Sequence, residues 1–435
     1  MAKDEKTSNG YHKETFLIHG HPHDEQWQYS HHVIPPITAS TAFRLDSTDR
    51  GAEGFRNFAL PHVTDAREKP IYIYDRLAEP TVALLENSFK EIESGGSATA
   101  FASGMAAISA AFLSLCTQGS KIVSHTTLYG CTYSLLTNWL PRFGIDVVFV
   151  DFTNLNDVEA AIDDQTRVLY FETPVNPNLD IIDIEAASAL AAKINENRTP
   201  ETLLQVVVDN TFATPFCQRP LLFGADIVVH SLTKNVMGFG TDMGGMLVGP
   251  QQLHGSVRMM RKDFGGVVAP RAAWNILVYG LSSLAIRMER QNRSALEVAS
   301  YLEEREDVAS VRYPGLKSHP QHALAVKQMK DFRGRFAPGL MIYFELKGSG
   351  ARLLTRAKAF MDFIANNSYV LTLAVSLGQA KTLIEAPALM THSVYGADGV
   401  LAGMNPAAIR LAIGLEEPGD IIRDLESAFD YINSV

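Results

Sequence analysis

The stretch that determines the fold of this chain runs from residue 204 to residue 234 and reads LQVVVDNTFATPFCQRPLLFGADIVVHSLTK. It holds two apolar, β-branched runs, 204–208 and 226–230, and polar residues follow each of them. Asp209 ends the first run, and Lys234 follows the second one twenty-five residues later. Continuous apolar runs of this kind are typical of parallel strands that are buried on both faces. The stretch therefore predicts two strands of a doubly wound α/β sheet.

The same pattern extends to both sides of this stretch. Further strand-like runs occur at 121–124, 146–150, 167–171 and 246–248, and helical spacing occurs at 81–92 and 105–115. Asn154 is expected to cap a helix that begins at Leu155. Alternating strands and helices predict a mostly parallel, seven-stranded-type sheet covered on both faces. Ligands of such a sheet bind at the carboxyl ends of its strands.

The rest of the chain follows different patterns. A long helix rich in Arg and Glu is expected from about residue 284 to 304, and mixed strands and helices after it indicate a smaller α+β domain. The first 70 residues are expected to be irregular and polar. We therefore expect an extended N-terminal arm at 1–78, a large α/β domain at 79–283 and a C-terminal α+β domain at 284–435.

The composition is typical of a large soluble globular protein, because 46% of the 435 residues are hydrophobic and 20% are charged. The 38 basic and 48 acidic residues give a net charge of −10, which disfavours general nucleic-acid binding. No run of about 18 apolar residues occurs, so we expect no membrane span. The charged N-terminus lacks an apolar signal core, and Cys116, Cys131 and Cys217 cannot all pair. These features predict a reduced, cytoplasmic protein.

The N-terminus carries six of the thirteen histidines: His12, His19, His21, His23, His31 and His32. A metal-binding arm is one interpretation. No acidic or cysteine cluster accompanies these histidines at ligand spacing, however, and prolines interrupt any regular scaffold. We therefore expect no metal and an arm that packs on another surface.

Lys234 is the residue that most directly suggests a chemistry. A lysine just past a strand is usually a solvated loop residue, but here Ser231 and Thr233 precede it and Asp209 ends a nearby strand. A Ser103-Gly104-Met105 turn also opens a helix. Together these groups suit pyridoxal 5'-phosphate, whose aldehyde binds an amine, whose ring nitrogen pairs with an acid, and whose phosphate binds hydroxyls and helix amides.

A nicotinamide cofactor is disfavoured, because the glycine-rich run 238–244 has Met243 where the dinucleotide pattern needs a glycine. The chain instead resembles the Cys/Met-metabolism branch of the fold-type I pyridoxal-phosphate enzymes, from about Tyr72 to the C-terminus. The stretches that carry this resemblance are 74–76, 79–81, 102–108, 129–132, 171–177, 208–211, 230–234, 374–378, 390–392 and 409–411.

The resemblance implies a role for each matching residue. Lys234 is expected to hold the cofactor and move protons, Tyr129 to stack on its ring and protonate the departing sulfur, and Asp209 to pair with the ring nitrogen. The phosphate is expected to contact Ser103, Gly104, Met105, Ser231 and Thr233, with Tyr74 and Arg76 reaching it from a neighbouring subunit. Asn176 is expected at the cofactor hydroxyl and Ser376 at the substrate backbone. The implied assembly is a homotetramer built from dimers, with active sites shared between subunits.

Arg410 is the candidate for binding the substrate carboxylate. In a strand, Ile409, Leu411 and Ile413 face one way and Arg410 faces the other. An arginine among apolar neighbours needs an acidic partner, and a carboxylate can bind it in bidentate fashion. A structural salt bridge is the alternative interpretation.

Two further features resemble the family members that eliminate methionine to 2-oxobutyrate, ammonia and methanethiol. These are Cys131 and the pair Lys262-Asp263 near the expected substrate pocket. The alternatives are that Cys131 is a small buried hydrophobic residue and that Lys262 and Asp263 form a surface pair. A cystathionine γ-lyase, an O-acylhomoserine sulfhydrylase, or an inactive protein that keeps the cofactor for binding are the alternative functions.

The chain also departs from the family pattern. Asp75 stands where serine is usual, and Glu79 stands where asparagine is usual before Pro80. The segments 44–72 and 331–338 are longer than expected. Because the first segment leads to Tyr74 and Arg76, these departures bear more on the substrate than on the cofactor.

Overall fold

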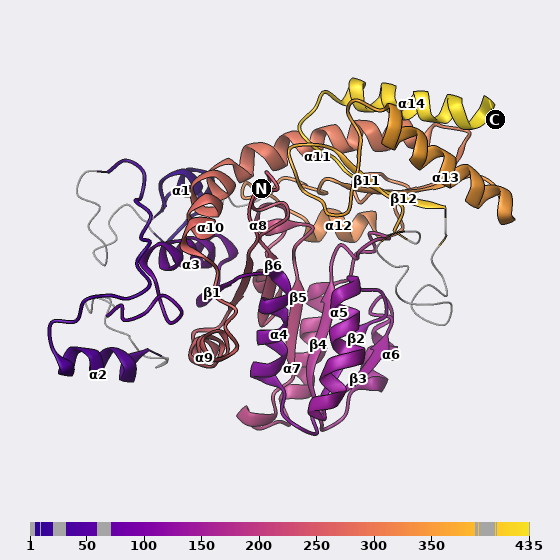
Figure 1. Ribbon diagram of the computed structural model, residues 1–435. Helices are drawn as coiled ribbons and strands as arrows, with labels where there is room; N and C mark the ends of the chain where they lie inside the picture. Colours follow the sequence, from indigo (N-terminus) through magenta and orange to yellow (C-terminus); the bar gives the residue numbers. More distant parts are fainter. Residues whose placement is uncertain are drawn as a thin grey trace.

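The computed structural model describes residues 5–8, 10–20, 32–58, 71–387, 390, 405 and 407–434. Its centre is a seven-stranded sheet with the order β1-β7-β6-β5-β4-β2-β3 (Figure 1). The strands are β1 Ser97–Phe101, β2 Lys121–His125, β3 Asp146–Val150, β4 Thr166–Glu172, β5 Gln205–Asp209, β6 Ile227–Ser231 and β7 Gly245–Gly249. Only β7 runs antiparallel to its neighbours, which confirms the mostly parallel sheet. The sequence patterns did not indicate β1, because Ser97–Phe101 reads SATAF, in which small and polar residues replace the apolar β-branched run.

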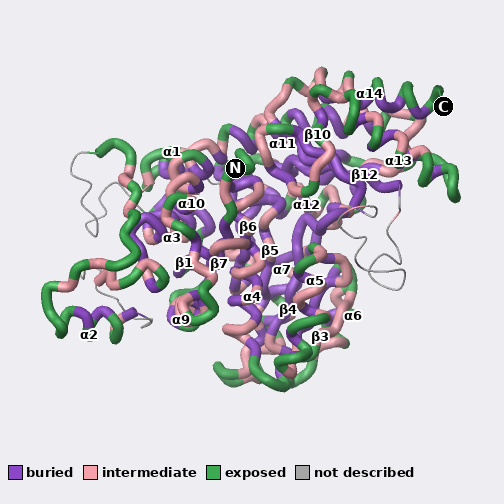
Figure 2. Tube along the Cα trace, in the orientation of Figure 1, coloured by how far each residue is buried: buried purple, intermediate pink, exposed green. Residues whose placement is uncertain are grey.

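Side chains of the sheet alternate between two faces, each packed under helices. Val168 and Tyr170 of β4 lie in one apolar cluster with α4, whereas Leu169 and Phe171 lie in the other with α7. The helices of this part of the chain are α3 Pro80–Glu93, α4 Gly104–Leu115, α5 Gly130–Ser134, α6 Leu155–Ala161, α7 Ile184–Asn195, α8 Thr214–Cys217 and α9 His254–Phe264. Figure 2 shows the strands buried between these layers. The doubly wound arrangement follows from strands that are apolar on both faces.

A second, five-stranded sheet lies towards the C-terminus, with the order β10-β11-β12-β9-β8. Its strands are β8 Val308–Arg312, β9 Met341–Leu346, β10 Thr372–Leu373, β11 Leu383–Glu385 and β12 Ala408–Ala412. The accompanying helices are α11 Ser282–Glu303, α12 His322–Gln328, α13 Gly350–Asn367 and α14 Pro418–Ser434. Before them, α10 Pro270–Asn275 and η6 Ile276–Leu281 contact α3. Phe344 of β9 packs against Phe360 of α13 and Phe429 of α14. The expected long helix is α11, and the mixed architecture of the smaller sheet agrees with the α+β expectation.

The expectation of an irregular N-terminus was wrong in part, because the structure contains α1 Lys13–His19 and α2 Thr48–Asn57. Lys13 of α1 is buried, and its Nζ donates to the carbonyl of Ile92 and to Ser94 Oγ, both at 2.9 Å. Ser47 Oγ caps α2 by accepting from Arg50 N. Both helices are short and depend on contacts with distant segments, which a local pattern does not reveal.

Part of the histidine-rich segment, including His21, His23 and His31, lies outside the described residues. Within the described residues, no group of three or more His, Cys, Asp or Glu side chains is placed to hold a metal ion. No helix in the described part of the chain has the length and apolar character needed to cross a membrane.

Candidate active site

The site is built where parallel strands end side by side. Strands β4, β5 and β6 are neighbours in the sheet, so their carboxyl ends meet at one edge. Glu172 and Asp209, the last residues of β4 and β5, are directly paired in the register. The turn that carries Lys234 follows β6 at the same edge. The structure therefore brings Asp209 and the segment that carries Lys234 together, as the sequence predicted.

The amine of Lys234 points towards the smaller sheet, where its Nζ donates to Ser376 Oγ at 2.9 Å. Burial lowers the pKa of Lys234 from its usual value, and the nearby positive charge of Arg410 lowers it further. A lowered pKa leaves more of the amine neutral, which is the form that attacks a carbonyl carbon. Ser376 has a φ of 104°. Strained backbone of this kind is found preferentially at functional sites.

Asp209 is a buried acid held beside the end of β6. Burial raises the pKa of its carboxyl, and hydrogen bonds from Thr211 oppose that rise. Thr211 N donates to Asp209 Oδ1 at 2.9 Å, and Thr211 Oγ1 accepts from Ser231 N at 2.8 Å. Thr211 thus connects the acid to the turn before Lys234. A carboxylate in this position suits a protonated ring nitrogen, because the partner's positive charge offsets the cost of burial.

The start of α4 forms a cradle against the end of β6. Ser103 caps this twelve-residue helix by accepting from Ala106 N at 3.2 Å. At Gly104 an added Cβ would lie only 2.9 Å from Ser231 Cβ, so a side chain there would fill the cradle. Thr233 Oγ1 accepts from Gly244 N at 3.1 Å, which fixes the turn between Ser231 and Lys234. Free helix N–H groups beside a serine hydroxyl fit a phosphate group.

Met105, the second residue of α4, packs towards α5, where the hydroxyl of Thr132 lies 3.8 Å from its sulfur.

Tyr129 precedes α5 and is 39% exposed. Burial raises the pKa of Tyr129, and a hydrogen bond with the Cys131 side chain adds to the rise. The phenol therefore stays protonated at neutral pH and can serve as a proton donor. Cys131 is free and exposed, so the alternative of a buried hydrophobic cysteine was wrong.

Arg410 of β12 is buried and has several partners. Its Nη1 donates to Asn176 Oδ1 at 2.6 Å, and its Nη2 lies 2.9 Å from Glu385 Oε1. Its Nη2 also donates to the carbonyl of Ser376 at 3.2 Å. The structural salt bridge considered for this arginine is therefore present. The same contacts also bring together Arg410 and Ser376, which were predicted at the substrate, and Asn176, which was predicted at the cofactor hydroxyl.

Tyr74, Arg76, Lys262 and Asp263 form a separate group. The Arg76 guanidinium lies 5.7 Å from the centre of the Tyr74 ring, and its Nη1 donates to the carbonyl of Lys262 at 2.7 Å. Lys262 Nζ pairs with Asp263 Oδ1 at 3.2 Å on α9, as the surface-pair alternative proposed. The contacts of Arg76 are thus with Tyr74 and α9 rather than with the Lys234 group.

The structure gives a local reason for one departure from the family pattern. Glu79 caps α3, because its Oε2 accepts from Val82 N at 2.8 Å, a role that asparagine also performs at helix starts. Asp75 is different, because burial raises the pKa of its carboxyl and Arg261 only partly opposes that rise.

Glu172 is a site residue that sequence reasoning missed. Its Oε1 accepts from Tyr129 N at 2.7 Å, and its carboxylate also accepts from the backbone N–H of Asn176. Burial and the negative charge of Asp209 raise the pKa of Glu172 well above its usual range. One carboxylate therefore holds two residues that face the site. Its position directly after the apolar run 167–171 was the available signal, because strand ends bind ligands in such sheets.

Comparison with known proteins defines the class. A profile of the family of Cys/Met metabolism PLP-dependent enzymes matches residues 14–430. The chain belongs to this family, and its enzymes depend on pyridoxal 5'-phosphate. The lysine, buried acid and glycine cradle described above fit that cofactor.

Individual relatives cover almost the whole chain. The sequence is 43% identical to L-methionine gamma-lyase of Fusobacterium nucleatum subsp. polymorphum over 403 residues, which cover 91% of this chain and 93% of the relative. It is 37% identical to L-methionine gamma-lyase of Porphyromonas gingivalis, with 99% and 100% covered. The structure of cystathionine gamma-lyase from Lactobacillus plantarum complexed with L-serine matches with a TM-score of 0.82 and 33% identity, over 97% and 99% of the two chains.

Replacing Glu172 by glutamine should disturb the bound cofactor. Glu172→Gln keeps the shape but exchanges one acceptor oxygen for an NH₂ group, so Tyr129 N or Asn176 N loses its partner. We expect changed visible circular dichroism of the cofactor and a dissociation constant raised about tenfold, because a buried donor left without its acceptor costs about 1–3 kcal/mol. Equilibrium dialysis and spectroscopy of the loaded protein measure both.

Asp226→Asn is the matched control. Asp226 Oδ2 also accepts a backbone N–H, from Val206 at 2.7 Å, but at the opposite end of the sheet. This variant should lose thermal stability without changing the cofactor signal. Unchanged dichroism and unchanged affinity in Glu172→Gln would remove Glu172 from the account of the site.

Proposed function

We propose that this protein catalyses the α,γ-elimination of L-methionine and related sulfur amino acids to 2-oxobutyrate, ammonia and methanethiol. The observation that carries the proposal is the contact of the Tyr129 phenol with the exposed Cys131 thiol beside the Lys234 amine. The relatives named L-methionine gamma-lyase, at 36–43% identity, support it further.

We propose that Lys234 attaches the cofactor, Asp209 pairs with the ring nitrogen, and Ser103, Gly104, Met105, Ser231 and Thr233 bind the phosphate. Asn176 and the ring of Tyr129 complete the contacts on the cofactor. When bound, pyridoxal phosphate withdraws electrons from the substrate carbons. Once substrate displaces the Lys234 amine, that amine is free to take a proton from the α-carbon of the substrate and return it to a later carbon of the substrate. Its lowered pKa leaves more of the amine neutral and able to accept a proton.

Tyr129 supplies the proton that the departing sulfur needs. Its phenol keeps that proton because its pKa is raised, and the thiol of Cys131 holds the hydroxyl in place. At the other side of the site, Arg410 grips the substrate carboxylate with Ser376 alongside. Substrate binding then shares the guanidinium between Glu385, Asn176 and the incoming carboxylate, a distribution that its two outer nitrogens allow.

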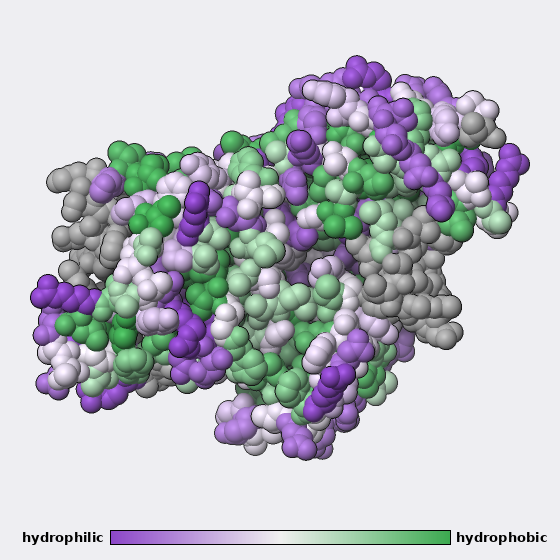
Figure 3. All heavy atoms as spheres, viewed as in Figure 1, coloured by the Kyte–Doolittle hydropathy of each residue, from purple (hydrophilic) through white to green (hydrophobic). Residues whose placement is uncertain are grey.

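We further propose a cytoplasmic homotetramer, a dimer of dimers, in which Tyr74 and Arg76 complete the phosphate site of a neighbouring subunit and Lys262 and Asp263 lie near its substrate. The support is that Arg76 contacts α9 instead of its own Lys234 group. Exposed apolar residues also include Ile18 of α1, Tyr279 of η6 and Ile286 of α11. Figure 3 shows hydrophobic side chains gathered on the side of the molecule where α1 and α10 lie. Such patches are typical of interfaces. We also propose that each subunit consists of an N-terminal arm at 1–78, a large α/β domain at 79–283 and a C-terminal α+β domain at 284–435.

The loaded enzyme should release 2-oxobutyrate and methanethiol in equal amounts from L-methionine alone. A dehydrogenase-coupled assay measures the first product and a thiol reagent the second. Lys234→Ala should abolish both, because no amine then holds the cofactor or moves the proton. Elimination that persists in Lys234→Ala would contradict the proposal.

Other substrates separate the alternatives. If the loaded protein releases neither product from methionine, cleavage of cystathionine would identify a cystathionine γ-lyase. Turnover of O-acylhomoserine only with added thiol or sulfide would identify a sulfhydrylase.

Two inactive variants should restore each other when they share an oligomer. Co-expressed Lys234→Ala and Arg76→Ala subunits form mixed dimers in which one site has both residues intact. Random pairing should then recover about one quarter of wild-type activity. The control is a mixture of the two separately expressed variants that do not exchange subunits. If each site is formed within one subunit, the co-expressed protein should be no more active than this control.

A further inference from the structure

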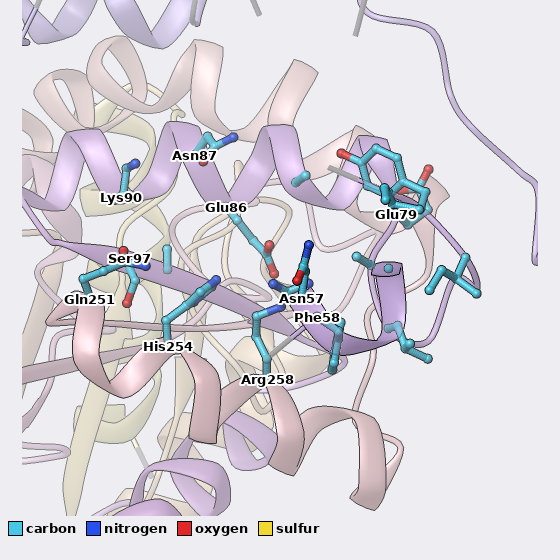
Figure 4. A pocket seen from close by; sticks show the side chains of 18 of the residues that line it. Asn57, Phe58, Glu79, Glu86, Asn87, Lys90, Ser97, Gln251, His254 and Arg258 are labelled. Carbon is cyan, nitrogen blue, oxygen red and sulfur yellow. The ribbon is translucent and has the colours of Figure 1, made fainter. Parts of the chain in front are cut away.

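A cavity of about 540 Å³ lies apart from the Lys234 group, between α2, α3, α9 and the segment 71–79. Figure 4 shows Glu86, Asn87 and Lys90 of α3 across the cavity from His254 and Arg258 of α9. The volume falls in the range of small-molecule sites, which is about 300–1,000 Å³. Its described lining includes none of the residues assigned to the cofactor or substrate.

Arg258 is the unusual residue of this cavity. Arg219, Arg261 and Arg287 are buried, and each donates at least three hydrogen bonds. Arg258 makes neither a hydrogen bond nor an ion pair with any described residue, whereas in Arg219 and Arg261 only the Nε lacks a partner. The Arg258 guanidinium instead lies 4.4 Å from the centre of the Phe58 ring. Arg258 is half-buried, and a partly desolvated cation without an acceptor needs an explanation such as a bound ion or ligand.

The negative charge of Glu86 acts on Arg258, but no acid of the described lining forms an ion pair with it. Glu86 Oε1 is already shared by Arg261 Nη1 and Ala100 N. Glu79 caps α3, and burial raises the pKa of its carboxyl, which favours the neutral form. The remaining acid of the lining, Glu53, is exposed to solvent.

Other lining groups add positive potential or are neutral. Burial, and then the positive charges of Arg258, Arg261 and Lys90, lower the pKa of His254 to about 3, so its ring is neutral at pH 7. Lys90 of α3 also lines the cavity and makes no ion pair with a described residue. Each of the two facing sides of the cavity thus carries a cation, Lys90 on α3 and Arg258 on α9 (Figure 4).

Apolar side chains form another part of the wall, among them Phe58, Ile71, Ile73 and Leu77. Helix α2 packs closely on this wall, since a Cβ at Gly54 would lie 2.7 Å from Ile73 Cδ1. The lining therefore combines a cationic and an apolar part. Such a surface suits an organic anion whose charged end binds a guanidinium and whose body contacts the apolar wall.

We infer that this cavity is a binding site for a small organic oxyanion, with a carboxylate or phosphate group held by Arg258 and Lys90. The site goes beyond the proposed lyase activity and does not depend on it. The wall of the cavity includes Ile73 and Leu77, which precede Tyr74 and follow Arg76 in the sequence. Helix α9 already contacts this segment, because Arg261 Nη2 donates to the Leu77 carbonyl at 3.0 Å. An occupant would add a further bridge to the two that already join α9 and the segment, from Arg261 to the Leu77 carbonyl and from Arg76 to the Lys262 carbonyl.

Titration of the loaded enzyme with sodium butyrate and with sodium phosphate, at constant ionic strength, tests the inference. Calorimetry should show saturable binding of at least one probe, and the melting temperature should rise with it. Arg258→Met should weaken binding at least tenfold, because charge-assisted hydrogen bonds are lost. Without a probe, Arg258→Met should melt close to the wild type, since the variant removes both a partly desolvated cation and its contact with the Phe58 ring.

Arg352→Gln, at an exposed position on α13, is the control and should bind like the wild type. Lys90→Met is a second variant in the cavity and should weaken binding in the same direction. Equal binding by wild type and Arg258→Met would place the anion elsewhere, for example at Arg410, and would overturn the inference. Absence of any saturable binding to the wild type would overturn it as well.

Discussion

Two buried carboxylates, Glu172 and Asp209, lie side by side at the ends of adjacent parallel strands, and the rest of the site is arranged around them. Burial raises the pKa of both groups, and the negative charge of Asp209 raises the pKa of Glu172 further. The protein offsets this cost with directed donors. Backbone N–H groups of Tyr129 and Asn176 face Glu172, and Thr211 faces Asp209. The requirement to satisfy the acids thereby fixes the loops that surround the Lys234 amine.

The smaller sheet joins the same network from the other side. Arg410 reaches from β12 to Asn176, which is held by Glu172, and Ser376 accepts from the Lys234 amine. Lys234 consequently lies beside a fixed guanidinium that, together with burial, lowers its pKa. The packing of two sheets that are distant in sequence thus leaves more of the amine in the neutral form, which can accept a proton or attack a carbonyl carbon. A single strand end supplies only part of this arrangement.

The sequence alone was sufficient to predict the residues whose surroundings are local. Apolar runs indicated β2 to β7, and Asp209 and the Lys234 turn follow such runs directly. Features that depend on long-range pairing were not predictable in this way. Strand β1 pairs with β7, and α1 is held by the hydrogen bond from Lys13 to the carbonyl of Ile92 in α3. Glu172 acquires its role only when β4 lies next to β5. The unpaired state of Arg258 also becomes visible only when α2 and α9 are brought together. The catalytic and cofactor roles stay predictions.

The central claim is that this network makes the Lys234 amine the attachment point of the cofactor. Borohydride reduction of the loaded enzyme fixes the cofactor permanently to the amine that holds it, and peptide mass spectrometry then locates the modification. The account predicts a single reduced pyridoxyl group per subunit, on Lys234. Modification of a different lysine, such as Lys262 or Lys90, with Lys234 unmodified would contradict the account.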